Sequence, residues 1–319
     1  MTQIMFSFWF FGIFVLVCLV IYDFHFRYKV NSEKWSVSWF DQYNKTIFLT
    51  YDDGPSSNGK IFYRRNDKQK RVGDSEIEDM RRKDAITEIM PDYDFLTTPT
   101  NNILNLLLTL NVHATFFIMG EALAFDISET GASSVKRMVD EGHTLGNHTY
   151  SHKFSPAQSP NWVVEDMIKS HDLITQVTGI SPTIYRPPQG AWSVELTDKL
   201  RENDILKDYV YPMMWTKDFG GTYAFYDPQL VEKIKNQVTH FFEKNRNTGG
   251  RIVLLHDPYI YSVLVTAELI RQAPQYGFKF GTPEELVQYW RKNLELHQKS
   301  PLKFYFSYRL RQKGKQIYR

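Results

Sequence analysis

Residues 45–55 have the sequence KTIFLTYDDGP, and they predict how the rest of the chain is organised. The first seven residues are rich in β-branched and aromatic side chains, which is typical of a buried β-strand. Asp52, Asp53, Gly54 and Pro55 follow at the end of this strand. Asp, Gly and Pro all favour turns, so this tetrapeptide by itself predicts only a turn.

Strands and helices alternate along the remainder of the chain. We expect strands at residues 114–119, 144–147, 183–186, 211–215, 251–256 and 278–280, and helices at residues 101–110, 133–141, 162–177, 193–203, 228–244 and 263–273. A last helix begins with a capping box, in which Thr282 is the N-cap, Pro283 the first helical residue and Glu285 the third. This alternation predicts an α/β fold with a parallel sheet, open or closed into a barrel.

Side chains able to do chemistry follow several of these strands. They are Asp52 and Asp53, His148 and His152, Arg186, Asp218, and His256. The carboxyl ends of parallel strands meet at one edge of a sheet or barrel, where α/β proteins build their sites. We therefore expect these side chains to lie near one another.

Two of these histidines belong to the segment HTYSH (residues 148–152), in which the imidazoles are four residues apart. This spacing places both on one face of a helical turn, and one added carboxylate completes a set typical of catalytic zinc centres. Because the chain has one cysteine, a Cys-rich zinc site is excluded and any metal depends on His and carboxylates. Of two adjacent aspartates, one is expected to bind the cation and the other to stay free as a base.

Composition and charge describe the chain outside this core. Hydrophobic residues make up 42% and charged residues 23%, which is ordinary for a globular protein, and the net charge of +2 argues against nucleic-acid binding as the main role. Residues 299–319 contain seven Lys or Arg and no Asp or Glu. With its aromatic residues, this tail is either a solvated end or a segment that adheres to anionic lipid headgroups.

The N-terminus carries a long apolar stretch. Residues 4–22 contain no charge, and nineteen helical residues suffice to cross a bilayer core of about 30 Å. The stretch has neither a basic start nor a small-residue cleavage site, so an uncleaved membrane anchor is favoured over a cleaved signal peptide or a buried core helix. Arg27 and Lys29 follow it and, by the positive-inside rule alone, would keep the next domain cytoplasmic.

Three regions are therefore predicted. Residues 1–30 form a membrane anchor, residues 40–297 form one α/β domain, and residues 298–319 form the basic aromatic tail. Residues 58–94 of the domain are highly charged with both signs interleaved, and we expect a solvated, partly helical insertion there.

Taken together, the segments resemble the polysaccharide deacetylase family, carbohydrate esterase family 4, with its NodB homology domain. Its five motifs occur in order as TYDDGP (residues 50–55), HTYSH (148–152), RPPQG (186–190), a looser fourth around Trp215 and Asp218, and LLHD (254–257). The resemblance covers residues 45–290 apart from the charged insertion. It implies a distorted (β/α) barrel of the NodB type.

The resemblance also implies roles for the site residues. A divalent metal, most often zinc, would be held by Asp53, His148 and His152. Asp52 would be the general base and His256 the general acid. Arg186 would pair with Asp52, and Asp218 would orient or charge His256. A cationic neighbour keeps a carboxylate ionised, and a carboxylate partner raises the pKa of a histidine, so these pairings suit those roles.

Substrate contacts are less strongly indicated. The family commonly has an aromatic residue at the position of Gln189, whose backbone N–H would help hold the oxyanion. Trp215 and Tyr185 are further candidates for contact with the sugar, although packing in the pocket wall is the favoured interpretation for both. Phe219 stands where the family usually has Trp after the aspartate of the fourth motif, which favours an unusual substrate. His143 is expected to be a structural residue rather than a fourth ligand.

The function expected from this resemblance is a metal-dependent hydrolase that removes N-acetyl or similar N-acyl groups from amino sugars. Its substrate would be a cell-envelope glycan or a lipid-linked sugar, and its location the plasma membrane, with the catalytic domain facing the envelope. Two alternatives remain: a catalytically silent, membrane-tethered glycan-binding protein, and an iron oxygenase that uses two histidines and one carboxylate.

Overall fold

The computed structural model describes residues 44–56, 87–94, 96–130, 132–153, 158–191, 193–210, 212–220, 230–247 and 250–297. The predicted anchor at residues 1–30, most of the charged insertion and the tail at residues 298–319 lie outside this part of the chain. No helix within the described ranges is long and apolar enough to cross a membrane.

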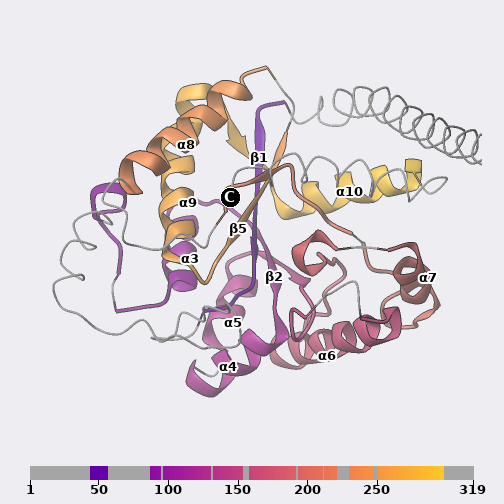
Figure 1. Ribbon diagram of the computed structural model, residues 1–319. Helices are drawn as coiled ribbons and strands as arrows, with labels where there is room; N and C mark the ends of the chain where they lie inside the picture. Colours follow the sequence, from indigo (N-terminus) through magenta and orange to yellow (C-terminus); the bar gives the residue numbers. More distant parts are fainter. Residues whose placement is uncertain are drawn as a thin grey trace, which may run out of the picture.

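A parallel sheet forms the centre of the molecule, with β1 (Thr46–Asp52) in its middle (Figure 1). One side of β1 pairs with β2 (Thr115–Ile118) and the other with β5 (Arg251–His256), and all of these pairs are parallel. The remaining strands are β3 (Thr144–Asn147) beside β2, β4 (Lys217–Asp218) beside β5, and β6 (Lys279–Phe280) beside the start of β1. The predicted α/β class and parallel sheet are confirmed.

Two of the expected strands are reduced. Residues 183–186 contribute only single bridges, from Tyr185 to Asn147 and from Ile184 to Val210. The strand expected at residues 211–215 is absent from residues 212–215, and β4 begins instead at Lys217. Prolines at 187, 188 and 212 lack the N–H that a ladder needs, which explains both differences. Among the described residues, the pairs form an open row from Val210 to β4 rather than a closed barrel.

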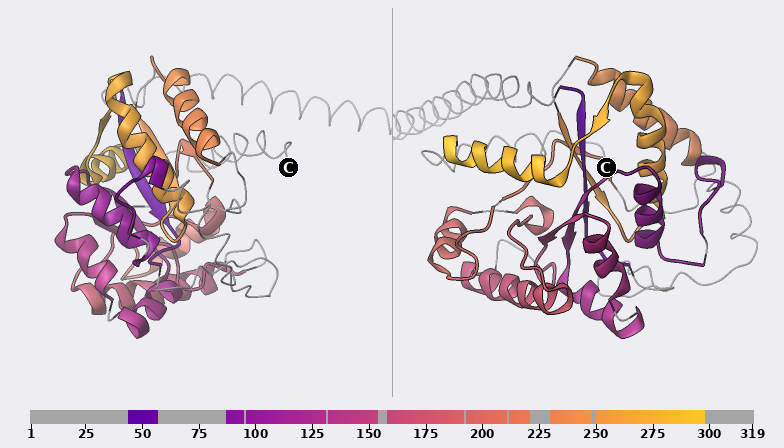
Figure 2. Two further views of the ribbon diagram at one scale, coloured as in Figure 1. Left: turned by 90° about the vertical axis from the view of Figure 1, so that its left-hand side faces the viewer. Right: turned by 180° about the vertical axis from the view of Figure 1, so that it is seen from behind.

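Eight α-helices surround the strands in the described part of the chain. They are α3 (Pro99–Thr109), α4 (Gly120–Thr130), α5 (Ser133–Asp140), α6 (Pro160–Thr178), α7 (Val194–Glu202), α8 (Leu230–Lys244), α9 (Ile260–Gln272) and α10 (Pro283–His297). Figures 1 and 2 show α3, α8 and α9 grouped on one side of β1 and α10 on the other. Helix α4 was not expected from the sequence.

The core lies on both faces of β1, all seven residues of which are buried. Ile47, Leu49 and Tyr51 belong to one hydrophobic cluster, whereas Phe48 belongs to a second cluster that includes Trp290 of α10. Successive side chains of a strand point to opposite faces, so a strand buried on both sides needs an almost continuously apolar sequence. The sequence IFL at residues 47–49 meets this need.

The capping box of α10 is present as predicted. Thr282 Oγ1 accepts a hydrogen bond of 3.2 Å from the backbone N–H of Glu285, and Glu285 Oε2 accepts one of 2.9 Å from the N–H of Thr282. The helix therefore begins where the sequence predicted it, with both reciprocal bonds formed.

Candidate active site

The strand register brings the predicted site residues to one edge of the sheet. Asp52, the last residue of β1, lies opposite His256, the last residue of β5, and opposite Phe117 of β2. Asn147 ends β3 opposite Ile118, and His148 follows it directly. Because all of these strands are parallel, their carboxyl ends form one edge on which the side chains meet.

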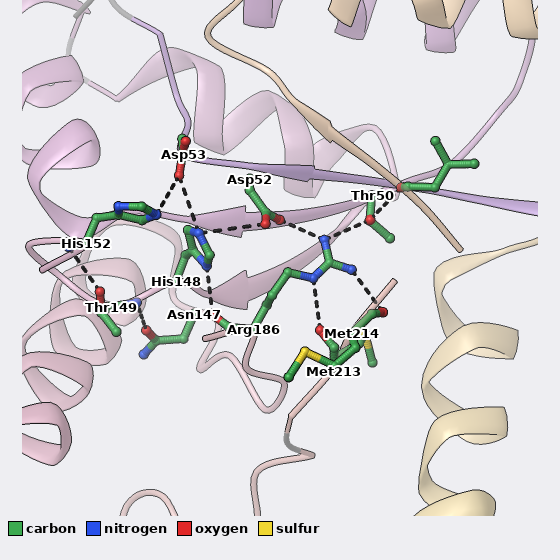
Figure 3. A network of polar contacts seen from close by, with 11 residues as sticks. Thr50, Asp52, Asp53, Asn147, His148, Thr149, His152, Arg186, Met213 and Met214 are labelled. Atoms are coloured by element: carbon green, nitrogen blue, oxygen red, sulfur yellow. Dashed lines mark hydrogen bonds and ion pairs between the residues drawn. The ribbon is translucent and has the colours of Figure 1, made fainter. Parts of the chain in front are cut away.

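Asp53, His148 and His152 form a compact cluster at this edge (Figure 3). Asp53 Oδ1 lies 3.2 Å from His152 Nε2 and 3.4 Å from His148 Nε2, and the three candidate ligand atoms lie within 4.8 Å of one another. Asp53 has a φ of 73°, and this left-handed turn directs it away from the line of β1. The structure therefore brings together the three residues expected to bind the metal.

The two histidines do not lie on a helical turn, and that part of the prediction was wrong. Residues 148–152 form a loop in which Thr149 and His152 have φ values of 65° and 53°. Helical geometry is replaced because the backbone of this loop bonds to side chains and to neighbouring elements. The family resemblance implied that both histidines bind a metal, and tertiary contacts rather than a helical turn bring their rings together.

The hydrogen bond of His148 prepares its ring for a cation. Its Nδ1 lies 2.7 Å from the carbonyl oxygen of Arg186, which only accepts, so Nδ1 donates and Nε2 is left with its lone pair. Asp53 Oδ1, which Nε2 faces, is buried and has no hydrogen-bond partner among the described residues. Two imidazole nitrogens and one carboxylate oxygen are a donor set that suits a divalent metal such as zinc.

In the absence of a cation, a proton on the histidines supplies part of the positive charge that a metal would bring to this cluster. Burial opposes charge on Asp53, but the imidazoles of His152, His148 and His256 outweigh it and lower the pKa of this carboxyl. Burial likewise opposes protonation of His148, but Asp52 and Asp53 outweigh it and raise its pKa. Burial lowers the pKa of His152, with Asp53 opposing the shift. A cation and a proton therefore compete for the same cluster.

Asp52 pairs with Arg186, as the resemblance implied. Arg186 is fully buried, and its Nη1 donates hydrogen bonds of 2.7 Å to Asp52 Oδ1 and 2.8 Å to Thr50 Oγ1. Its Nε donates to the carbonyl of Met213 (Figure 3). Its guanidinium lies over the ring of Phe117. The other oxygen of Asp52 lies 3.7 Å from His148 Nε2, on the side of the proposed metal.

His256 is in place, but its expected partner is not. Asp218 Oδ1 accepts a hydrogen bond of 2.7 Å from the N–H of Gly220, and His256 Nδ1 is buried without a hydrogen-bond partner in the described part of the chain. The reason lies in the register, because Asp218 is opposite Leu254, two residues before His256. Two strand residues span about 6.6 Å, which a short aspartate side chain does not bridge.

The three candidates for substrate contact differ in exposure. Tyr185 is fully buried among core residues, so it packs in the wall and offers no surface to a sugar. Trp215 is half-buried, with its ring 5.6 Å from the Arg186 guanidinium carbon. Gln189 is exposed in the 3₁₀ turn Pro188–Gly190, where its φ is 57°. Phe219 is also buried, so its difference from the family lies in the core.

His143 lies at the opposite end of the sheet from the metal cluster. It precedes β3, and its Nδ1 accepts a hydrogen bond from the N–H of Ala114, which precedes β2. Burial, with His113 and Arg137 adding to it, lowers the pKa of His143 to about 4. It is therefore a neutral structural residue at pH 7, as predicted.

Several residues that support the site were missed. Asp257 is buried, accepts a 2.6 Å hydrogen bond from Thr100 Oγ1, and packs so closely on Gly54 that a Cβ there would overlap its carboxylate. Burial, together with Asp53 and Asp52, raises the pKa of Asp257 to about 8. Its place after His256 in the fifth motif was the available signal, whereas nothing in the sequence pointed to Thr100.

Comparisons with known proteins agree with this geometry. Residues 87–206 match the sequence profile of the family described as polysaccharide deacetylase. This match includes His148, His152 and Arg186, whereas Asp52, Asp53 and His256 lie outside it.

Two relatives of this chain are named as peptidoglycan deacetylases. The peptidoglycan-N-acetylmuramic acid deacetylase PdaC of Bacillus subtilis is 29% identical over 189 residues, which cover 59% of this chain and 36% of that protein. The peptidoglycan-N-acetylglucosamine deacetylase PgdA of Listeria monocytogenes is 26% identical over 243 residues, which cover 76% of this chain and 39% of that protein. The chain thus spans less than half the length of either relative.

A solved structure extends the likeness to the fold. The structure of the peptidoglycan deacetylase PdaC from Bacillus subtilis aligns with a TM-score of 0.50 and 24% identity, over 82% of this chain and 99% of that chain. At this identity the likeness concerns the fold, and it agrees with the parallel-sheet α/β architecture described above.

Proposed function

Residues 87–206 match the polysaccharide deacetylase family, and from that match we propose that this chain is a metal-dependent amino-sugar N-deacetylase. Its substrate would be an N-acetylated glycan of the cell envelope or a lipid-linked amino sugar. The observation that carries the proposal is the meeting of three features at one sheet edge: the cluster of Asp53, His148 and His152, the pair of Asp52 and Arg186, and His256.

Asp53, His148 and His152 would hold the metal through one carboxylate oxygen and two Nε2 atoms, a donor set that suits zinc. The chemistry supplied by a divalent cation held there would be activation of a water molecule and polarisation of the substrate carbonyl group. The protein prepares this by fixing the His148 ring on the Arg186 carbonyl and by burying Asp53 Oδ1.

In this proposal Asp52 acts as the general base. One of its oxygens is held by Arg186, and the other faces the metal cluster, where it can take a proton from the attacking water. The guanidinium keeps the carboxylate in one orientation and compensates its charge in a buried setting.

In this proposal His256 acts as the general acid. It stands opposite Asp52 across the β1–β5 pair, and protonated it can donate to the nitrogen of the leaving amine as the C–N bond breaks. The products are the free amino sugar and acetate. Asp218 would contribute to the charge around His256 from β4 without a direct bond, and the backbone N–H of Gln189 would stabilise the developing oxyanion.

The relatives named as peptidoglycan deacetylases support an envelope glycan as substrate. Acetate release would be measured with peptidoglycan fragments, N-acetylglucosamine oligomers and lipid-linked N-acetyl sugars. Matched samples would contain the Asp52→Asn and Asp53→Asn variants and a chelator-treated enzyme. We expect release by the parent protein, recovery of chelated enzyme with zinc, and a loss of at least 100-fold in both variants.

Other outcomes would favour the alternatives. Acetate at the level of the variants on every substrate would contradict the deacetylase. Chelator-insensitive glycan binding without turnover would point to a silent binding protein, and oxygen consumption with bound iron to an oxygenase.

The membrane location is a further part of the proposal. It rests on the uncharged sequence of residues 4–22 and on the basic, aromatic residues 299–319, which lie outside the described ranges. Reporter fusions after residue 40 and cell fractionation would test it, and a protein found entirely in the soluble fraction would contradict the anchor.

A further inference from the structure

The loop of residues 148–152, here called the histidine loop, carries both histidines of the metal cluster and has all five of its backbone N–H groups bonded. The acceptors, in order from His148 to His152, are the carbonyl of Ile118, Asn147 Oδ1, Asp166, Asp166 again, and Thr149 Oγ1. Asp166 thus accepts hydrogen bonds from the N–H groups of Tyr150 and Ser151, which lie between the two histidines in the sequence.

Asp166 lies in α6 and reaches the loop with one carboxylate oxygen. Its Oδ2 accepts hydrogen bonds from the N–H of Tyr150 at 3.1 Å, the N–H of Ser151 at 3.0 Å and the hydroxyl of Ser151 at 3.1 Å. The carbonyl oxygen of Asp166 also lies 3.1 Å from the Tyr150 nitrogen. Hydrogen bonds to a charged acceptor are stronger than neutral ones, so this carboxylate is the main attachment of the loop to α6.

Helix α4 holds the opposite side of the loop. The N–H groups of Gly120 and Glu121, at its first turn, donate to the carbonyls of Thr149 at 2.9 Å and Tyr150 at 2.8 Å. Helix α4 packs against α6, so the loop is held between two helices that are in contact. One helix binds its carbonyl groups and the other its N–H groups.

The conformation of the loop needs this support. Thr149 and His152 both have positive φ, which residues with a side chain rarely adopt unless surrounding contacts enforce it. Without the Asp166 carboxylate, the N–H of Ser151 would lose its acceptor and the loop could relax towards ordinary backbone angles. The Nε2 atoms of His148 and His152 would then separate.

We propose that Asp166 is a positioning residue that sets the spacing of His148 and His152 for a divalent cation, acting through Tyr150 and Ser151. The inference rests on the proposed metal site, but it concerns the preparation of that site before a metal binds. Asp166 does not belong to the metal cluster itself. Its contribution should therefore appear in metal affinity and in coordination geometry.

The test compares four variants of the full chain. Asp166→Leu removes the acceptor at similar size, and Asp166→Asn retains a neutral acceptor oxygen. Ser151→Ala removes the hydroxyl, which donates to Asp166 and accepts from the N–H of Lys153, and leaves the backbone bonds to Asp166 in place. Glu165→Leu is the matched control, because it changes an exposed carboxylate at the adjacent position of α6. Zinc affinity would be measured by competition with a chromophoric chelator, the cobalt-substituted site by visible absorption, and the metal-free fold by thermal unfolding.

We expect Asp166→Leu to weaken zinc binding by about 10- to 100-fold and to alter the cobalt spectrum, as loss of a group that orients metal ligands does. Asp166→Asn should recover part of the affinity, Ser151→Ala should have a small effect, and Glu165→Leu none. Parent-like zinc affinity and cobalt spectrum in Asp166→Leu would overturn the proposal. If that variant does not fold, Asp166→Asn decides, and parent-like values in it count against the proposal.

The parent protein separates the two claims. Absence of zinc binding in the parent would contradict the metal site of the proposed function. Tight binding in the parent and equally tight binding in a folded Asp166→Leu protein would contradict only the role of Asp166.

Discussion

Arg186 shows how much of the site depends on one buried side chain. It bonds to Asp52, Thr50 and the backbone of Met213, while its own carbonyl fixes the ring of His148. One residue therefore orients both the proposed base and a proposed metal ligand. Arg186, the first residue of the third motif, therefore contributes to the site from the core.

Replacing Arg186 by Met should destabilise the metal-free protein by about 3–5 kcal/mol, because Asp52 would remain buried without a compensating charge. Urea unfolding followed by circular dichroism would measure this loss. The double variant Asp52→Asn, Arg186→Met should be more stable than Arg186→Met alone, because the unpaired charge is gone. If Asp52→Asn destabilises the Arg186→Met protein as much as it destabilises the parent protein, the two residues do not interact in the folded protein.

Gly54 is required for a different reason, close packing. A Cβ at this position would overlap the carboxylate of Asp257, so Gly54→Ala should destabilise the protein by about 1–3 kcal/mol. Combining it with Asp257→Ala would remove the overlap, and the combined loss should be smaller than the sum of the two single losses. If the losses of the two single variants, measured by thermal unfolding, simply add in the double variant, the overlap is not the cause of the destabilisation.

At the scale of elements, the ends of the strands and helices explain which predictions from the sequence were confirmed and which were wrong. β1, β3 and β5 begin and end within a residue of where their apolar patterns place them. Helix α4 starts without a capping side chain, and its first N–H groups donate to the histidine loop instead. A helix whose start is stabilised by a distant loop has no local start signal.

The capping box of α10 provides a test at this scale. Thr282→Ala should lower the free energy of unfolding by about 1 kcal/mol, since it removes the acceptor for the Glu285 N–H. Activity should be unchanged, because α10 follows β6, which pairs with the start of β1, at the end opposite Asp52. Chemical denaturation and acetate release on the same preparation would check both statements, and a large loss of activity with little loss of stability would contradict them.

At the scale of the whole molecule, the two ends of the sheet have opposite chemistry. The carboxyl ends of the strands gather Asp52, Asp53, His148 and His256, whereas the other end contains His143 in a neutral state. Parallel strands enforce this polarity, because every strand contributes its carboxyl end to the same edge. The side chains of the proposed active site therefore lie at one end of the sheet, and His143 lies at the other.

His143 should make the stability of the protein dependent on pH. Its folded pKa of about 4 lies below the usual 6.5, so between these values the unfolded chain binds more protons. Stability should therefore fall as the pH falls from about 6.5 to about 4, by up to about 3 kcal/mol at 1.36 kcal/mol per unit. Besides burial, the groups that lower the pKa of His143 are His113 and Arg137.

His143→Asn is the control, because its amide oxygen can accept from the Ala114 N–H without titrating. Unfolding free energies measured at several pH values should show a weaker acid dependence in this variant. An unchanged slope would assign the dependence to other groups.

The sequence by itself determined the order of most strands and helices, the α/β class, and the residue types at the site. These features depend on local apolar patterns and on the chemistry of side chains, both of which are written along the chain. It also indicated the ligands Asp53, His148 and His152 and the pair of Asp52 and Arg186, which the structure brings together.

Only the tertiary structure decided how those residues are held. It replaced the expected helical turn at residues 148–152 by a loop, placed Asp218 too far along β4 to bond to His256, and brought Asp166 and Asp257 to the site from other elements. Each of these outcomes depends on contacts between residues distant in the sequence. Strand register and packing set those contacts, and a local pattern does not encode them.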